Sequence, residues 1–276
     1  MRKARILFIS QEITPYLEET SLAHIGRYLP AGVQDKGKEI RTFMPRFGCI
    51  NERRNQLHEV IRLSGMNLII DDTDHPLIIK VASIQSARMQ VYFIDNEEYF
   101  NRKNTFRDSK KNFYEDNDSR TIFFCRGVLE TVKKLGWSPD IIHCHGWITS
   151  LIPLYLKTSY KDDPIFANSK VVYSVYNHEF TEKFNADYAR KVKMEGMTNE
   201  DLKLLKTSPD FVNINLTAMK YADAIVQGSD KINPELSAFF KKTDKPNLGY
   251  HNVDEYIKAY YNFYDQLLVG QELLAE

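Results

Sequence analysis

The sequence predicts an α/β fold built on a parallel sheet, and three observations support this prediction. Short apolar runs typical of buried strands alternate with longer segments of helical periodicity. A complete strand–helix–strand unit lies within residues 4–45. No internal repeat or linker rich in Pro, Gly or Ser divides the 276 residues, and 43% of them are hydrophobic. We therefore expect one domain with a sizeable core.

Five apolar runs are expected to be strands of this sheet, and a further stretch adds shorter ones. The five runs are residues 4–10, 39–45, 139–147, 169–177 and 222–229. Residues 54–94 hold three more runs of β-type composition, separated by turn signals such as Asp-Asp-Thr-Asp. These runs favour hairpins, so we expect a short β-rich insertion near residues 50–115.

Helical periodicity predicts the elements that connect the strands. The expected helices are residues 22–36, 119–135 and 148–160, followed by a C-terminal helix. Thr20 or Ser21 is the candidate N-cap of the first helix and Ser119 that of the second. Gly136 follows the second helix as a C-cap signal.

The stretch GYHNVDEYIKAYYNFYDQLL predicts a strong helix at the end of the fold. Asn252 and Glu255 form an N-cap and capping-box pair. One apolar stripe follows, made of Val253, Tyr256, Ile257, Tyr260, Tyr264, Leu267 and Leu268. Packing is the simplest role for its tyrosines. We expect residues 1–240 to form the main domain and residues 241–276 a linker and helix that pack on it.

Charge and cysteine content exclude several kinds of partner. Lys+Arg and Asp+Glu both number 37, and this zero formal charge argues against a nucleic-acid or anionic-membrane partner. The three cysteines, Cys49, Cys125 and Cys144, do not have the spacing of a zinc or redox pair, which favours a reduced, cytoplasmic setting. The first residues lack the pattern of a signal peptide, and no stretch is long and apolar enough to span a membrane.

Four segments that follow predicted strands are the candidate ligand-binding loops. They are residues 10–21, 143–147, 176–180 and 227–230. In open parallel sheets, ligands bind outside the carboxyl ends of the strands. We therefore expect these segments to share one edge of the sheet, the carboxyl rim, although the strand order is not predicted.

The segment HCHGW carries the most distinctive candidate side chains. His143 and His145 are two residues apart, so on a strand they face the same side. A metal site would need a third ligand, and none has suitable spacing, so we expect no metal. His143 suits a hydrogen-bonded core position, whereas His145 lies closer to the loop and suits a polar ligand. Trp147 suits either stacking on a sugar ring or packing in the core.

Two polar residues stand before the second helix, in FYEDNDSR. Asp116 is a carboxylate that suits sugar hydroxyls, and Asn117 follows it. A plain helix-entry turn explains the same residues, and composition alone favours that simpler interpretation.

Five longer segments match motifs of one known family. They are FMPRFG (43–48), QVYFIDNEEYFNR (90–102), FYEDNDSR (113–120), GWSPDIIHCHGWITSLIPLYL (136–156) and KYADAIVQGS (220–229). Over about residues 4–236 the chain resembles the N-terminal half of bacterial glycogen and starch synthases, glycosyltransferase family 5. The resemblance implies a single Rossmann-like domain, the N-terminal half of a GT-B glycosyltransferase. It also implies the family reaction, glucosyl transfer from ADP-glucose to an α-1,4-glucan.

The chain departs from the family where phosphate is expected to bind. Glu18, Glu19, Thr20 and Ser21 stand where the family has K-T-G-G, so an acid replaces a cation. A carboxylate repels a diphosphate, and side chains in place of the glycines block close backbone approach. Further departures in the later motifs are Gly146 and Ile148 for Asp and His, and Tyr176 and Phe180 for His and Tyr.

The resemblance leaves several functions open. In the family, the C-terminal half supplies most donor contacts, and here only residues 237–276 follow the matched part, so we do not expect independent catalysis. A separate C-terminal-half or full-length synthase chain is one expected partner and α-1,4-glucan another. The alternatives are a non-catalytic glucan-binding or regulatory module and a structural, partner-binding protein. No G-x-G-x-x-G follows the first strand, so a dinucleotide enzyme is set aside, and no cofactor is expected.

Four residues are the candidates for a sugar site under this resemblance. His145 is expected to hydrogen-bond sugar hydroxyls or developing charge, and is the one candidate catalytic group. Asp116 is expected to hold hydroxyls, Trp147 to stack or pack, and Asn177 to orient a loop. None of them looks like a nucleophile or general base with a partner in reach.

Overall fold

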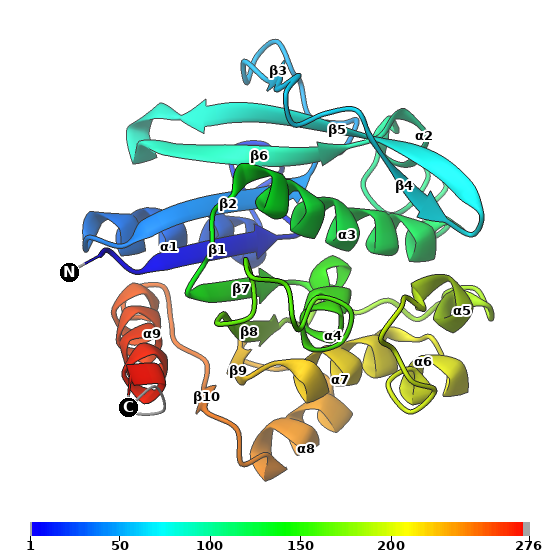
Figure 1. The fold of residues 1–276 in the computed structure, drawn as a ribbon. Helices are drawn as coiled ribbons and strands as arrows, with labels where there is room; N and C mark the ends of the chain where they lie inside the picture. The colour runs from blue at the N-terminus through cyan, green and yellow to red at the C-terminus, as the bar shows by residue number, and fades with distance from the viewer. Residues whose placement is uncertain (1, 273–276) are drawn as a thin grey trace.

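A ten-stranded sheet forms the centre of the computed structural model, which describes residues 2–272 (Figure 1). Its strands follow the order β10-β9-β8-β7-β1-β2-β6-β5-β3, and β4 pairs with β5 off this path. The strands from β10 to β6 run parallel, while β5 is antiparallel to both β6 and β3. This mainly parallel sheet with helices on both faces confirms the predicted α/β fold.

The five strands expected from apolar runs all form. They are β1 (Arg5–Ser10), β2 (Glu39–Pro45), β7 (Ile141–His145), β8 (Lys170–Val175) and β9 (Ala224–Gln227). Every residue of β7 is buried, which explains its unbroken apolar and neutral sequence. The short edge strand β10 (Asn247–Leu248) was not predicted.

The β-rich region extends the central sheet. It contains β3 (His58–Glu59), β4 (Met66–Ile70), β5 (Thr73–Ile84), the 3₁₀ helix η1 (Gln85–Ala87), β6 (Met89–Asp95) and α2 (Glu97–Phe100). The β4–β5 hairpin turns at Asp71 and Asp72, whose φ angles of 52° and 59° suit a tight two-residue turn. Because β6 pairs with β2, this region is continuous with the main sheet.

The first two long helices differ in how well their starts were predicted. Helix α1 (Ser21–Asp35) is capped by Thr20, whose hydroxyl accepts a bond from the Ala23 amide at 3.0 Å. Helix α3 (Asn117–Leu135) ends at Gly136 with φ of 60°, as expected. Its predicted start at Ser119 is wrong, because the Asn117 side chain bonds the preceding loop and already lies in the helix.

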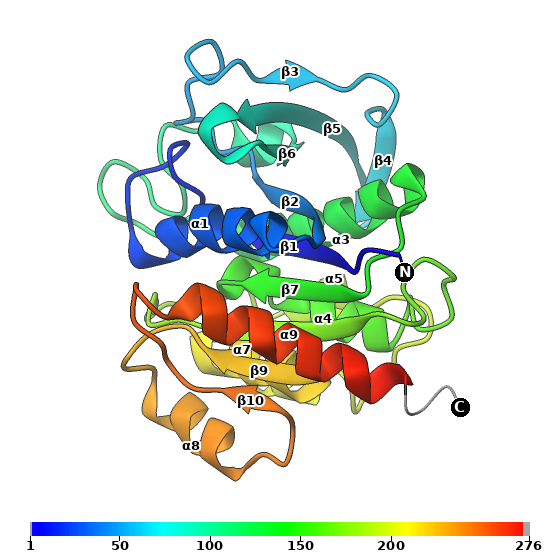
Figure 2. The ribbon, with the colours of Figure 1, turned by 90° about the vertical axis from the view of Figure 1, so that its left-hand side faces the viewer.

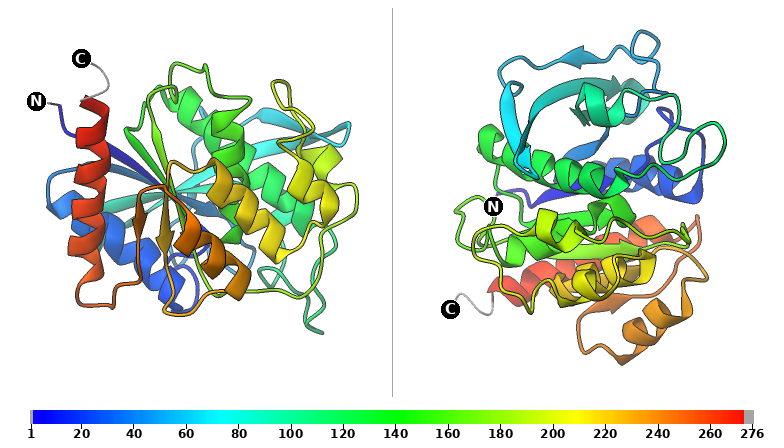
Figure 3. Two further views of the ribbon diagram at one scale, coloured as in Figure 1. Left: turned by 90° about the horizontal axis from the view of Figure 1, so that it is seen from below. Right: turned by 90° about the vertical axis from the view of Figure 1, so that its right-hand side faces the viewer.

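Helices cover both faces of the sheet (Figures 2 and 3). Helices α3, α4 (Leu151–Lys157) and α7 (Phe211–Tyr221) pack on one face, and α1 and α9 (Tyr256–Glu272) pack on the other. The remaining helices are η2 (Trp147–Thr149), α5 (Tyr188–Val192), α6 (Lys203–Thr207) and α8 (Pro234–Lys242). Within residues 2–272, no helix is long and apolar enough to cross a bilayer.

Helix α9 buries most of the stripe expected for it. Its core-facing side chains are Tyr256, Tyr260, Phe263, Tyr264 and Leu267. The tyrosines therefore pack, as predicted. Val253 is 65% exposed, so its place in the stripe is wrong, because the helix begins only at Tyr256. Asn252 Oδ1 accepts a bond from the Asp254 amide, which closes the turn before the helix.

Candidate functional site at the carboxyl rim

The four predicted loops share one edge of the sheet. Strands β1, β7, β8 and β9 are parallel and adjacent, so their carboxyl ends lie side by side. The register pairs Ser10 with His145 and His145 with Ser174. The expectation of a common carboxyl rim is therefore confirmed.

The turn between β1 and α1 is closed by its own side chains. Thr20 Oγ1 donates to Glu12 Oε2 at 2.7 Å while it caps α1. Glu18 and Glu19 are exposed, and residues 11–21 contain no Lys or Arg. The turn thus presents carboxylates to solvent at the position where the helix amino end would otherwise favour an anion.

His143 is a hydrogen-bonded core histidine, as the sequence suggested. Its Nδ1 lies 2.6 Å from the Tyr264 hydroxyl and its Nε2 lies 2.7 Å from Ser174 Oγ. Burial lowers the pKa of His143 well below its usual value, so the ring is neutral. Both ring nitrogens are occupied, which leaves none to bind a metal.

His145 has one occupied nitrogen and one free nitrogen. Its Nδ1 lies 2.8 Å from the Tyr176 hydroxyl. Its Nε2 is buried and has no hydrogen-bond partner among the described residues. The side chain is only 1% exposed, and burial lowers the pKa of His145 to about 3. His145 is therefore a neutral ring with an unused polar atom at the end of β7.

Trp147 is enclosed by aromatic side chains and is 4% exposed. Its ring centroid lies 4.5 Å from that of Phe106 and 5.1 Å from that of Phe180. Phe113 and Phe184 complete the cluster. Of the two interpretations of Trp147, the structure favours packing over stacking on a sugar, because the faces of its ring already contact protein.

The other two predicted residues bind protein groups. Asp116 accepts a bidentate bond from Arg102, with Nη1 to Oδ1 at 2.7 Å. Asn177 is exposed and accepts a bond from Ser229 Oγ at 3.1 Å, which joins the ends of β8 and β9. Asn177 therefore lies on the carboxyl rim with His145, whereas Asp116 lies at the start of α3.

Sequence reasoning missed the residue whose hydroxyl hydrogen-bonds His145. Tyr176 was noted as a departure from the family motif, but its hydroxyl bond to His145 was not foreseen. The strand register supplies this contact, since Ser174 pairs with His145 and Tyr176 comes two residues later. A reliable alignment of β7 with β8 is the only signal that would have revealed it.

The possible metal ligands and the three cysteines bear on metal and thiol chemistry. Within the described residues, no group of three or more His, Cys, Asp or Glu side chains is placed to hold a metal ion. Cys125 and Cys144 are buried and free, and Cys49 is exposed and free. Burial raises the pKa of Cys125 and of Cys144, which disfavours the reactive thiolate.

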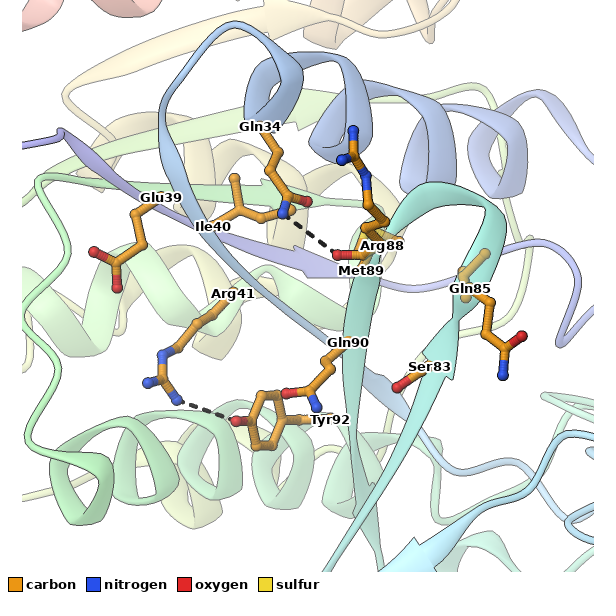
Figure 4. Close-up of a pocket in the computed structure, with 11 residues that line it drawn as sticks. Gln34, Glu39, Ile40, Arg41, Ser83, Gln85, Arg88, Met89, Gln90 and Tyr92 are labelled. Carbon is orange, nitrogen blue, oxygen red and sulfur yellow. Dashed lines mark hydrogen bonds between the residues drawn. The ribbon is translucent and has the colours of Figure 1, made fainter.

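A polar cavity of about 470 Å³ lies at the opposite edge of the sheet, where β2 and β6 begin (Figure 4). Arg41 donates to the Tyr92 hydroxyl at 3.1 Å, and Gln34 of α1 donates to the Arg88 carbonyl at 3.3 Å. Its lining includes none of the residues predicted for a sugar site. The cavity is thus separate from the carboxyl rim.

Comparisons with known proteins agree on one family. Residues 5–247 match the family model described as the starch synthase catalytic domain. The chain is 36% identical to a glycogen synthase of Chlorobium chlorochromatii over 236 residues, 81% of this chain and 47% of that protein. It is 34% identical to a glycogen synthase of Chlorobaculum tepidum over 272 residues, 98% of this chain and 54% of that protein.

A solved structure supports the fold alone. It is the catalytic domain of starch synthase IV from Arabidopsis thaliana, bound to ADP and acarbose. The TM-score is 0.73 at 18% identity, over 91% of this chain and 52% of that one. The chain thus spans about half the length of the relatives it matches. Together with the family match, these likenesses show that the chain belongs to the starch synthase catalytic domain family, glycosyltransferase family 5.

Proposed function

We propose that the chain acts in α-glucan metabolism as a synthase-type domain that does not hold the phosphates of ADP-glucose by itself. The family match supports the glycosyltransferase assignment. The proposal that the chain does not hold the donor phosphates rests on the acidic turn. Glu18 and Glu19 are exposed there, beside the first turn of α1. Independent glucosyl transfer is therefore not expected of this chain.

Magnitudes favour repulsion over attraction at this turn. A helix amino end stabilises an anion by roughly 0.3–1 kcal/mol at an exposed site. A carboxylate about 4 Å from a phosphate charge opposes this with about 1 kcal/mol in water, and more where the dielectric is lower. Two carboxylates, Glu18 and Glu19, thus outweigh one helix end. The Thr20 hydroxyl is also engaged, since it bonds both Glu12 and the Ala23 amide.

Titration calorimetry tests this proposal directly. The purified chain is titrated with ADP-glucose and, in a separate cell, with maltoheptaose. We expect no heat of binding from ADP-glucose. Clear ADP-glucose binding would overturn the interpretation of the turn and restore the chain as a candidate catalyst.

A second function is a module that binds a protein partner, such as a synthase chain, at the carboxyl rim. The packing of Trp147 against Phe106 and Phe180 favours it over a glucan-binding module, because the ring has no open face for a sugar. Heat from maltoheptaose would support the glucan-binding module instead. If neither ligand gives heat of binding, the partner-binding module is the better account.

A further inference from the structure

The cavity at the start of β2 and β6 lies in a gap between these two strands, at what we call the amino edge of the sheet (Figure 4). Strand β2 pairs with β1 from Glu39 onward, and β6 pairs with β5 as far as Met89. Between β2 and β6, pairing begins only at Thr42 and Val91. Each strand is thus held by its outer neighbour while the two diverge from one another, so the gap belongs to the folded sheet and is not a frayed end.

Main-chain donors and acceptors line this gap. Residues 39–41 and 89–90 are not paired with one another, although both segments line the cavity. In a parallel ladder, each strand directs alternate N–H and C=O groups at its neighbour, so these segments direct theirs into the gap. A gap with such groups on both walls suits a ligand that is rich in hydrogen-bonding atoms.

Side chains of the lining add unused hydrogen-bonding groups. Gln34 Nε2 donates to the Arg88 carbonyl at 3.3 Å, whereas Gln34 Oε1 is buried and has no partner among the described residues. Ser83 and Gln90 are exposed and stand opposite one another on β5 and β6. Amide and hydroxyl groups of this kind both donate and accept bonds, which matches the hydroxyl groups of a sugar.

Apolar side chains close the other side of the cavity. They are Ile40, Ile84 and Met89, and they alternate along the strands with the polar residues of the lining. Ile84 and Met89 are only 5% and 2% exposed, so this side belongs to the core. A sugar ring carries C–H groups between its hydroxyls, and it therefore suits a lining that is polar on one side and apolar on the other.

The charges of the lining favour a neutral ligand. Glu39 accepts a bond from Arg5 Nε at 3.2 Å, and Arg88 Nη2 lies 3.4 Å from Asp35 Oδ1. Of the charged lining residues, Arg41 alone has no ion pair with a described residue. Phosphate recognition typically uses several charged donors, and one guanidinium close to a carboxylate does not supply them.

We propose that this cavity binds a segment of a neutral oligosaccharide, which under the proposed function is an α-1,4-glucan. Its volume of about 470 Å³ lies within the roughly 300–1,000 Å³ of small-molecule sites. The inference rests on the proposed role in α-glucan metabolism, although the cavity shares no residue with the carboxyl rim. The enclosed Trp147 offers a sugar no open face at the rim, so the glucan binds at the amino edge and takes no part in glucosyl transfer there.

Amide resonances of the nitrogen-15-labelled chain locate the bound sugar. With maltoheptaose as the probe, we expect the largest changes in chemical shift in residues 39–41 and 83–90. Changes confined to residues 143–147 and 176–180 would place the sugar at the carboxyl rim and overturn the proposal, as would no change at millimolar sugar. Equal changes at the cavity with inorganic phosphate would also overturn it, because they would reveal an anion site. In a separate sample, changes in residues 11–21 with ADP-glucose would overturn the proposed function and leave the cavity proposal standing.

Variants of the lining test whether its amides bind the sugar. Gln90→Met and Gln34→Met remove hydrogen-bonding groups at nearly constant volume, and Gln90 is exposed, so its variant should fold. We expect each to weaken maltoheptaose binding roughly three- to tenfold, the equivalent of one lost hydrogen bond. Gln266→Met is the matched control, since this glutamine is exposed on α9 outside the cavity, and it should keep the parental affinity. Parental affinity in Gln90→Met and Gln34→Met, or equal weakening in all three variants, would refute the site.

Discussion

A Cβ atom placed on Gly228 would lie 2.5 Å from the ring of Tyr176. Gly228 follows β9 and Tyr176 follows β8, so the ring lies against bare backbone at the carboxyl rim. The same ring carries the hydroxyl that contacts His145. The lack of a side chain at Gly228 is thus what lets Tyr176 reach the end of β7.

Gly228→Ala should therefore destabilise the fold. The new methyl group forces the buried Tyr176 ring to move, and overpacking of this kind costs typically about 1–3 kcal/mol. Urea unfolding followed by circular dichroism measures the loss. Gly249→Ala is the matched control, because nothing lies within 4 Å of its Cβ position, and its midpoint should stay near that of the parent. Equal losses in the two variants would contradict this account of the Tyr176 contact.

Trp147→Ala should cost stability, because the ring packs inside an aromatic cluster. Removal of a buried Trp typically costs about 3–5 kcal/mol. The ring is 4% exposed and contacts Phe106 and Phe180, so the large end of this range is expected. The control, Tyr250→Ala, removes a ring that is 43% exposed and should change stability by less than about 0.5 kcal/mol. If Trp147→Ala keeps full stability but loses maltoheptaose binding, the ring serves a ligand and not the core.

Acid should weaken the fold through the buried histidines. Burial lowers the pKa of His145 to about 3 and that of His143 well below its usual value, so between these values and about 6.5 the unfolded chain binds more protons. The stability from each neutral ring is complete above about pH 6.5 and is lost as pH falls. The slope is at most about 1.4 kcal/mol per pH unit for each ring.

Urea unfolding of His145→Asn at about pH 7.5 and about pH 5 checks this dependence. The variant should be less sensitive to pH than the parent, because one of the two rings no longer takes up a proton on unfolding. His58→Asn replaces an exposed ring and should retain the parental dependence. An identical pH dependence in His145→Asn and the parent would show that His145 is not the group responsible.

The acidic turn makes a further prediction for nucleotide-sugar binding. Glu18→Lys combined with Glu19→Thr removes two like charges and adds a cation beside the first turn of α1. We expect the free energy of ADP-glucose binding to improve by about 1–2 kcal/mol, which corresponds to roughly tenfold tighter binding. The gain should be larger at low salt. Glu195→Lys combined with Glu200→Thr, at exposed positions between α5 and α6, makes the same change in total charge and is the control. The same affinity gain in both proteins would assign the effect to net charge and not to the turn.

Strands β1, β7, β8 and β9 could be predicted because each is a mainly apolar run that is buried on both faces. Helix α1 was predictable for a similarly local reason, since Thr20 caps it within three residues of sequence. The carboxyl rim followed from topology alone, because parallel strands end at the same edge. Of the C-terminal stripe, only Val253 was misplaced, where a turn precedes the helix.

The side-chain partners could not be predicted, because they depend on contacts between distant segments. His145 meets Tyr176 only through the register of β7 and β8. Trp147 is enclosed by rings from the loops near residues 106 and 180, which no local pattern links to it. Asp116 is engaged by Arg102, which turns a candidate sugar ligand into one half of an ion pair.

Glucosyl transfer by the isolated chain is the measurement that tests the central claim most directly. The purified chain is incubated with radiolabelled ADP-glucose and glycogen, and the label in precipitated glucan is counted. On the proposal that Glu18 and Glu19 repel the donor phosphates, we predict no incorporation above the protein-free control. Sustained incorporation that scales with the amount of chain would contradict the account.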